Sequence, residues 1–157
     1  MARQEQEKLE AALRRTAREI AAALDPFKEQ PRAAGRRELS RLIAAAPFAV
    51  LAHDDRQRYI AVNGPASALL GYAEPELLAL SVQDIVASEP PGAAAPSRRT
   101  FIRGGVQEGE LPLIRADGLI VVVTYAAVVQ ALRGVHLSVM APTLPASGVA
   151  SDGRAQV

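Results

Sequence analysis

The alternation of apolar and polar residues near the middle of the chain predicts a β-hairpin followed by a short helix. Two apolar runs, residues 48–52 and 58–62, flank the polar segment HDDRQ, an arrangement typical of two antiparallel strands joined by a turn. Asn63 follows the second run, where its side chain can accept a backbone N–H from the first turn of a helix. Gly71 ends the helical pattern and suits the left-handed position that closes many helices.

The C-terminal part of the chain contains three longer apolar segments that predict a meander of antiparallel strands. These segments cover residues 107–115, 119–129 and 133–141. Pro112 in the first segment has no N–H to donate to a ladder, so we expect this strand at an edge of the sheet.

The second of these strands is apolar on both of its faces. Because side chains alternate along a strand, one face carries Val121, Val123, Tyr125 and Ala127. The other face carries Ile120, Val122, Thr124 and Ala126. A strand that is apolar on both faces is covered on both. One cover is formed by the helices of the domain, and the other is either the N-terminal helix or a second subunit.

The segment before the meander predicts a loop and one further helix. Residues 88–97, SEPPGAAAPS, have the composition of a flexible loop. A short helix is expected around residues 98–103, with Phe101 and Ile102 directed inward and the Gly104-Gly105 pair as its stop signal.

The N-terminal residues 3–24 contain no Gly or Pro and predict a helix. Its apolar residues Leu9, Leu13, Ile20 and Leu24 fall on one side with heptad-like spacing. A seam this short leaves two interpretations open. The helix pairs with its copy in a second subunit, or it packs on its own domain.

These elements predict four regions along the chain. They are a dimerisation helix over residues 1–24, a linker over 25–37, an α+β domain over 38–142 and a disordered tail over 143–157. A second short helix, over about residues 36–45, leads into the first strand.

The composition excludes several classes of function. The chain has 157 residues, which fits one domain with extensions, and its net charge of +1 gives no bulk attraction to nucleic acid or membrane. It contains no cysteine, which excludes disulfides, thiolate zinc sites and a cysteine nucleophile. We find no apolar signal segment and no apolar run long enough to span a bilayer. We therefore expect a soluble cytoplasmic protein.

Several segments, taken in order, resemble the PAS domain family. They are Asp54/Asp55 in the turn, Tyr59 to Asn63, Ala68-Leu69-Leu70-Gly71-Tyr72, Pro75-Glu76-Leu77-Leu78, Gly109-Glu110-Leu111 and Arg115-Ala116-Asp117-Gly118. The resemblance covers residues 38–142. It implies an α+β fold with a five-stranded antiparallel sheet in the order 2-1-5-4-3, short helices on one face and the N-terminal helix as an extension. It also implies structural roles for Asn63, Gly71, Tyr72, Asp117 and Gly118, and a sensory or protein-interaction module in bacterial signalling.

No catalytic or metal site is expected. The chain has two histidines and no Gly-rich phosphate loop followed by a lysine. His53 and His136 are far apart in the sequence, with no carboxylates at ligand spacing.

Haem and flavin are not expected as cofactors. Haem-binding members of the resembled family supply an axial histidine from the last short helix before the meander, where this chain has Arg98, Arg99 and Arg103. Leu137 and Val139 are assigned inward on the final strand, which places His136 on the outer face. The absence of cysteine excludes the flavin-adduct chemistry of the light-sensing branch of this family.

The resemblance places a concave space between the sheet and the short helices. Two interpretations remain open, a pocket for a small organic ligand or a filled core. In the first, Tyr125 and an arginine supply the polar contacts. The residues assigned to this pocket are Ile85, Arg98, Phe101, Ile102, Leu111, Leu113, Val121, Val123, Tyr125, Leu137 and Val139.

The expected function is that of a non-catalytic sensor or regulator in signal transduction or transcription control, acting in trans as a homodimer. It binds a small molecule or a partner protein. The alternative is a ligand-free adaptor whose outer sheet face binds a partner such as a histidine kinase or a transcription regulator. The residues assigned to the dimer interface are Leu9, Leu13, Ile20, Leu24, Ile120, Val122 and His136.

Overall fold

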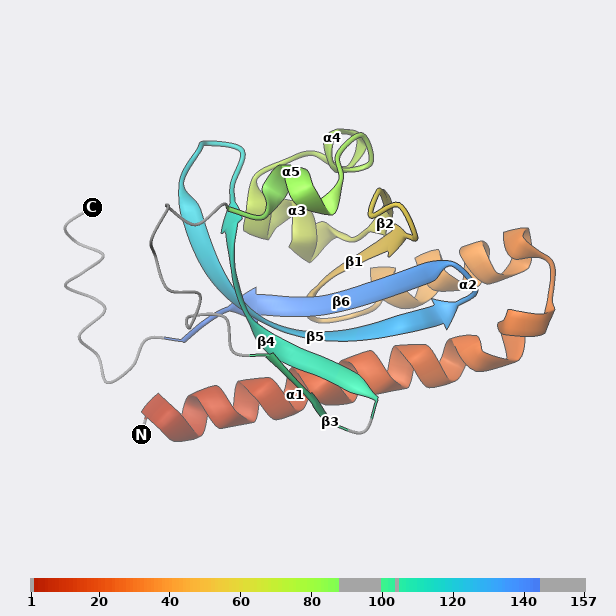
Figure 1. Cartoon of the computed structure of the whole chain (residues 1–157), viewed down its shortest axis with the longest axis horizontal. Coiled ribbons are helices and arrows are strands. Elements are labelled where there is room, and N and C mark those ends of the chain that lie inside the picture. Colours follow the sequence, from red (N-terminus) through yellow and green to blue (C-terminus); the bar gives the residue numbers. More distant parts are fainter. Residues whose placement is uncertain (1, 88–99, 104, 145–157) are drawn as a thin grey trace.

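The computed structural model describes residues 2–87, 100–103 and 105–144, which form an antiparallel sheet with helices on both faces (Figure 1). The strands are β1 (Ala49–Asp54), β2 (Tyr59–Val62), β3 (Thr100–Arg103), β4 (Val106–Ile114), β5 (Ile120–Leu132) and β6 (Val135–Pro142). The helices are α1 (Ala2–Leu24), α2 (Arg32–Ala44), α3 (Gly64–Leu70), α4 (Glu74–Leu77) and α5 (Val82–Ile85), with a 3-10 turn, η1 (Asp25–Glu29), after α1.

The order of the strands confirms the predicted topology and adds one strand to it. The sheet runs β2-β1-β6-β5-β4-β3. The first five of these strands have the predicted order 2-1-5-4-3, and β3 extends the sheet beyond β4. Pro112 is paired with Val122 on β5, and it lies beyond the stretch of β4 that pairs with β3. The predicted edge position is therefore wrong for β4 as a whole, because β3 pairs with it over residues 106–109. Beside Pro112 the backbone N–H of Ala87 donates to the Pro112 carbonyl at 3.0 Å, a contact that needs no donor from the proline.

The helix predicted around residues 98–103 is wrong for residues 100–103, which form β3. This strand pairs with β4 from Thr100 opposite Gly109 to Arg103 opposite Val106. Gly105 adopts a φ of +83°, the left-handed backbone that tight hairpin turns require. Gly105, which was interpreted as part of a helix stop, thus lies directly before β4. The predicted loop over residues 88–97 lies outside the described residues.

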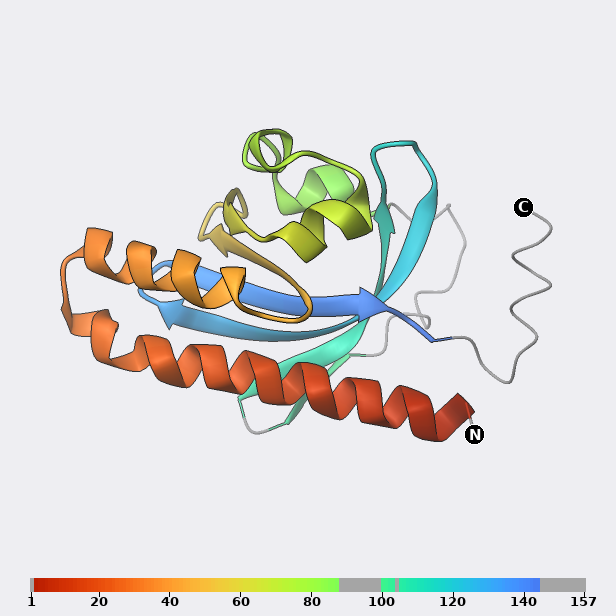
Figure 2. The ribbon, with the colours of Figure 1, turned by 180° about the vertical axis from the view of Figure 1, so that it is seen from behind.

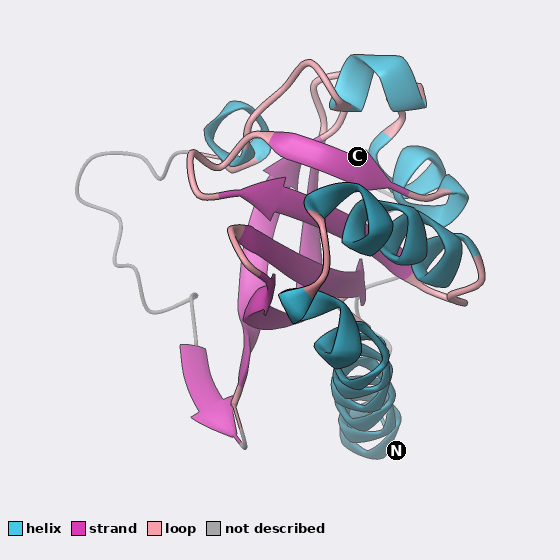
Figure 3. Ribbon diagram, turned by 90° about the vertical axis from the view of Figure 1, so that its right-hand side faces the viewer, coloured by secondary structure: helices cyan, strands magenta, loops and turns pink. Residues whose placement is uncertain are grey.

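The two faces of the sheet are covered by different helices. The face that we call outer is covered by α1 and α2, and the face that we call inner lies under α3, α4 and α5 (Figures 1 and 2). A view turned by 90° shows α1 end-on beside the sheet (Figure 3). Each face carries its own cluster of buried apolar side chains.

The N-terminal helix α1 packs on the sheet of its own chain. Leu13, Ile20 and Leu24 are buried there together with Ala17, and Leu9 packs against the same cluster. Of the two covers predicted for the outer face, the structure therefore has the N-terminal helix. The assignment of Leu13, Ile20 and Leu24 to a subunit interface is corrected, because their side chains are buried within the chain. No described helix combines the length and the apolar character that crossing a bilayer requires.

The predicted linker over residues 25–37 contains ordered structure. The turn η1 includes Pro26 near its start, and α2 begins at Arg32 rather than near residue 36. Because this connector folds back, α2 lies beside α1 on the outer face and buries Leu39 and Ile43 in the same cluster.

The side chain of Asn63 holds together the end of α2, the beginning of β1 and the beginning of α3. Its Oδ1 accepts the backbone N–H of Ala66 in α3 at 3.1 Å, as the capping pattern predicts, and that of Val50 in β1 at 3.0 Å. Its Nδ2 donates to the carbonyl oxygens of Ile43 at 2.8 Å and Phe48 at 2.9 Å. This buried amide thus uses both its donors and its acceptor, and it joins the end of α2 to β1 and α3.

Candidate functional site

The inner face brings together six of the residues predicted to line a pocket. They belong to one cluster, in which α5 and the strands β4 and β5 meet: Ile85, Leu111, Leu113, Val121, Val123 and Tyr125. The side chains of Ile85, Leu113 and Val123 are fully buried. Gln107 Nε2 donates to the hydroxyl of Tyr125 at 3.2 Å, which gives this apolar region one polar contact on β5.

Leu137 and Val139 were assigned to the pocket wrongly. On β6 they lie opposite Ala52 and Val50 of β1, and all four side chains belong to the outer cluster. The prediction assumed that the more apolar face of β6 is the face that lines the pocket. The outer face is the more apolar one here, because α1 and α2 cover it completely at this strand.

Of the other three residues assigned to the pocket, one lies outside the described residues and two lie on β3. Arg98 lies outside the described residues, and so does Arg99. Phe101 and Ile102 lie on β3 rather than on a helix, opposite Glu108 and Gln107.

His136 lies on the inner face, so its predicted position on the outer face, on which its assignment to a dimer interface depended, is wrong. It is the partner of His53 in the pairing of β6 with β1, and the two ring centroids are 5.2 Å apart. Tyr59 packs edge-on against His53, with the ring centroids 6.3 Å apart. The sequence contains the residues of this group, but their meeting depends on the register of β1 against β6.

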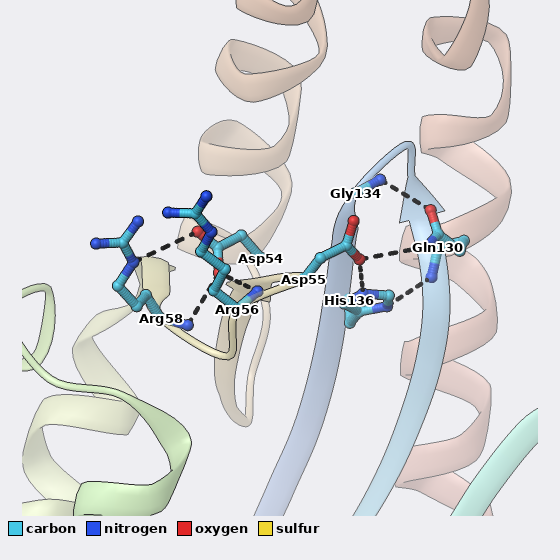
Figure 4. A network of polar contacts seen from close by, with 7 residues as sticks. All are labelled: Asp54, Asp55, Arg56, Arg58, Gln130, Gly134 and His136. Carbon is cyan, nitrogen blue, oxygen red and sulfur yellow. Dashed lines mark hydrogen bonds and ion pairs between the residues drawn. The ribbon is translucent and has the colours of Figure 1, made fainter.

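A polar network fixes the ring of His136 (Figure 4). Its Nδ1 accepts the backbone N–H of Gln130 at 3.0 Å, and its Nε2 lies 2.7 Å from Oδ1 of Asp55. The nitrogen that accepts from the backbone carries no proton, so the neutral ring donates from Nε2 to the carboxylate. Gln130 has a φ of +56° at the irregular end of β5, and its side-chain oxygen accepts the N–H of Gly134 at 2.8 Å. The network thus ties the β1–β2 turn to the β5–β6 turn.

The environment of this network shifts two ionisation equilibria. Burial lowers the pKa of His53 below its usual 6.5, and the neighbouring His136 lowers it further. Asp54 and Asp55 act on His53 in the opposite direction with smaller effect. Burial also raises the pKa of the Tyr59 hydroxyl. Within the described residues, no group of three or more acidic or histidine side chains is arranged to hold a metal ion.

A second polar site links α1 to the sheet. Arg14 Nε donates to Oε2 of Glu108 on β4 at 2.7 Å, and the side chain of Glu108 is only 4% exposed. This ion pair lies on the outer face between α1 and the edge half of the sheet. Sequence analysis did not identify it. The available signals were an arginine beside Leu13 on the apolar side of α1 and a glutamate on an apolar strand.

The N-terminal part of α1 is also joined to the end of the last strand. Gln6 Nε2 donates to Oγ1 of Thr124 at 2.8 Å, and Gln6 Oε1 accepts the backbone N–H of Leu144 at 3.0 Å. The hydroxyls of Thr124 and Thr143 are 2.9 Å apart. One side chain of α1 therefore contacts both the central strand β5 and the segment that leaves β6.

Comparisons with known proteins agree with this architecture. Residues 37–104 match the family model described as PAS domain. The LOV protein of Rhodobacter sphaeroides superimposes with a TM-score of 0.54 at 12% identity, over 77% of this chain and 74% of that chain. The PAS domain of an HTR-like protein from Haloarcula marismortui is 20% identical, with a TM-score of 0.48, over 68% of this chain and 89% of that chain. No curated protein matches the sequence.

The strand order and the short helices on the inner face define an α+β fold of the PAS kind. Residues 37–104, which match the family model, are thus similar to a PAS domain in sequence, and the chain has the PAS fold.

Proposed function

We propose that this chain is a non-catalytic sensor of signal transduction in which α1 is the output element. The observation that supports this proposal is that one sheet separates α1 from the inner face. A change in the packing of β4 or β5 on the inner face moves strands whose other side is in contact with α1. Since packed interfaces shift between discrete arrangements, such a change is passed on as a displacement of the helix.

Polar contacts between α1 and the sheet support this direction of coupling. The Arg14–Glu108 pair connects α1 to β4, and the Gln6 contacts connect it to β5 and to the segment after β6. The strands β4 and β5 also carry most of the inner-face residues assigned to the pocket, among them Leu113 and Val123. A small molecule held on the inner face would therefore act on the same strands that anchor α1.

Native mass spectrometry of the purified full chain, together with a thermal-shift screen against a metabolite panel, tests the sensor proposal. Retention of a small molecule, or stabilisation by one member of the panel, supports it, since a ligand that binds only the folded state raises its stability. A clean unliganded mass and no shift across the panel would contradict it.

A distance measurement between two spin labels tests whether α1 moves when the small molecule binds. Because the chain has no cysteine, the substitutions Glu7→Cys on α1 and Val129→Cys on β5 introduce the only two thiols to which spin labels can be attached. Both positions are exposed. We expect the distance distribution between the labels to change when the molecule is added or removed. An unchanged distribution in the presence of a bound molecule would exclude α1 as the output element.

A second candidate function, that of a dimerising adaptor, is favoured by an exposed apolar surface on the β4–β5 hairpin. Ile120 and Val122 project from the outer face with 60% and 45% of their surface exposed. The backbone N–H of Thr143 donates to the carbonyl of Val122 at 2.9 Å, which brings the exposed Leu144 beside them. We propose that two copies of the chain, or the chain and a partner protein, meet at this surface.

Two exposed valines on the same strand provide a matched test of the adaptor. Val122→Lys places a charge in the proposed surface, and Val129→Lys places the same charge on β5 away from it. Light scattering coupled to size exclusion should show a dimer for the unchanged chain and for Val129→Lys, and a monomer for Val122→Lys. A monomeric unchanged chain, or a dimer that tolerates Val122→Lys, would contradict self-association through this hairpin.

A further inference from the structure

We propose that a pocket at the far end of α1, on the outer side of the molecule, binds a small organic anion with a short apolar body. The pocket lies where η1, the beginning of α2 and the β5–β6 turn meet. Figures 1 and 2 show these three segments together at the end of the molecule away from the N-terminus. This pocket is separate from the inner face, and the proposal does not depend on the proposed function.

The size and the lining of the pocket fit a small ligand. Its volume is about 310 Å³, at the lower end of the range of small-molecule sites. Phe27 from η1 and Leu132 from β5 supply apolar lining. Gly35 of α2 allows close approach, because a Cβ at this position would lie 3.2 Å from both terminal methyl carbons of Leu132. The glycine thus brings the backbone of α2 close to the wall formed by the hairpin.

The observation that points to an anion is the guanidinium of Arg36. Its Nε is buried and has no hydrogen-bond partner. A buried N–H that has left water without gaining an acceptor is unfavourable, and native proteins contain few of them. Arg36 also lines the pocket, so a small shift of its side chain would bring this shielded donor to an acceptor bound there. Arginine presents parallel N–H groups that match the oxygens of a carboxylate or a phosphate.

The charge around the pocket favours the same class of ligand. Four basic side chains and one acidic side chain, that of Glu29, line it. Glu29 forms an ion pair with Arg133 at 3.2 Å, and both of these side chains are largely exposed at the rim. Lys28 is paired with Asp25 at 3.2 Å. Arg32 and Arg36 are therefore the two cations of the lining that form no ion pair with a described residue.

The ligand that this arrangement fits has two parts. A carboxylate or phosphate group would accept hydrogen bonds from Arg36, with Arg32 adding to the positive field. A short aliphatic or aromatic body would pack against Phe27 and Leu132. Inorganic anions lack the second part, and neutral alcohols lack the first, so both should bind more weakly.

Isothermal titration calorimetry of the full chain with four probes tests this requirement. The probes are hexanoate, phenyl phosphate, inorganic phosphate and hexanol. We expect hexanoate or phenyl phosphate to bind at least about tenfold more tightly than inorganic phosphate and hexanol, and the better of the two identifies the preferred anionic group. No measurable binding by either organic anion, or equal binding by hexanol, would overturn the proposal.

Neighbouring arginines on α2 provide the matched variants. Arg36→Met removes the charge and keeps an apolar side chain, whereas Arg37→Met makes the same change at an exposed position outside the pocket. We expect Arg36→Met to weaken binding of the organic anion about tenfold or more and Arg37→Met to leave it unchanged. Equal losses in the two variants would show that binding reflects overall charge, and equal retention would show that Arg36 has no part in it.

A spectroscopic readout keeps the test valid if Arg36→Met does not fold. In the unchanged chain, amide chemical shifts on adding the organic anion should move at Phe27, Gly35 and Leu132. Shifts confined to the inner face, for example at Leu113 and Val123, would place the anion in the other site and overturn this proposal.

Discussion

Arg14 and Glu108 are separated by 94 positions in the sequence, yet the guanidinium Nε of the first lies 2.7 Å from a carboxylate oxygen of the second. The pair joins the middle of α1 to β4 at the outer face. Because the side chains are only 17% and 4% exposed, water screens this interaction less than it screens the ion pairs on the surface of the chain. The pair thus fixes where α1 lies along the sheet.

Replacing Arg14 with Met should therefore destabilise the chain more than the same change next to it. We expect Arg14→Met to lower the free energy of unfolding by about 2 kcal/mol, the usual effect of losing a hydrogen bond between charged groups. Arg15→Met, at an exposed position on the same helix, should change it by less than about 0.5 kcal/mol. Urea titration followed by circular dichroism measures both. Equal effects of the two variants would mean that the Arg14–Glu108 pair adds nothing specific.

Asn63 should be replaceable neither by Ala nor by Asp. Asn63→Ala loses the two hydrogen bonds that it accepts and the two that it donates, so we expect a loss of about 3 kcal/mol in the free energy of unfolding. Asn63→Asp keeps an acceptor for Val50 and Ala66 but has no N–H for the carbonyls of Ile43 and Phe48. Denaturant titrations of the two variants separate the roles. An Asp variant as stable as the unchanged chain would show that only the capping bonds matter.

His53 should make the stability of the chain depend on pH below neutrality. Burial and the adjacent His136 lower the pKa of His53 in the folded state below its usual 6.5, while the unfolded chain keeps the usual value. Between the two values the unfolded state binds more protons, so the free energy of unfolding rises with pH. The stabilisation is complete above about pH 6.5 and is lost as the pH falls through this window toward the folded-state pKa.

The variant His53→Gln isolates this contribution, because Asp54, Asp55 and His136 remain. We expect the difference in melting temperature between the unchanged chain and His53→Gln to shrink as the pH is lowered from 7 toward 5. Thermal melts across this range provide the measurement. A difference that stays constant with pH would show that the folded and unfolded states protonate His53 equally.

Gly71 and Gly64 should respond in opposite ways to the same substitution. Gly71 closes α3 with a φ of +81°, and a Cβ there would make only an ordinary contact, 3.5 Å from the Cβ of Ala116. The expected loss for Gly71→Ala, about 1 kcal/mol, thus comes from the left-handed backbone. Gly64→Ala, where a Cβ meets nothing within 4 Å and φ is not positive, should be neutral or stabilise by up to about 1 kcal/mol. Chemical denaturation of both variants measures the contrast, and equal losses would contradict it.

The local features of the fold could be predicted from the sequence because short segments determine them. The cap formed by Asn63 and the left-handed Gly71 each follow from the chemistry of a single residue within its segment. The N-terminal helix and the order of the five main strands are confirmed as well. The hairpin of β3 was missed because a glycine pair serves equally well after a helix and between two strands.

The sequence by itself determined most of the elements, since these depend on periodicity and on residues with special backbone or hydrogen-bonding properties. The order of the strands was implied by the resemblance to the PAS domain family rather than by periodicity. The tertiary structure alone decided which side chains share a face of β6. Leu137 and Val139 face α1 and α2, and His136 meets His53 and Asp55, because both faces of the sheet are covered and alternation cannot tell one buried face from the other. The contacts of Arg14 with Glu108 and the convergence on the pocket at Arg36 join residues far apart in the chain, so they arise only when α1, α2 and the sheet pack together.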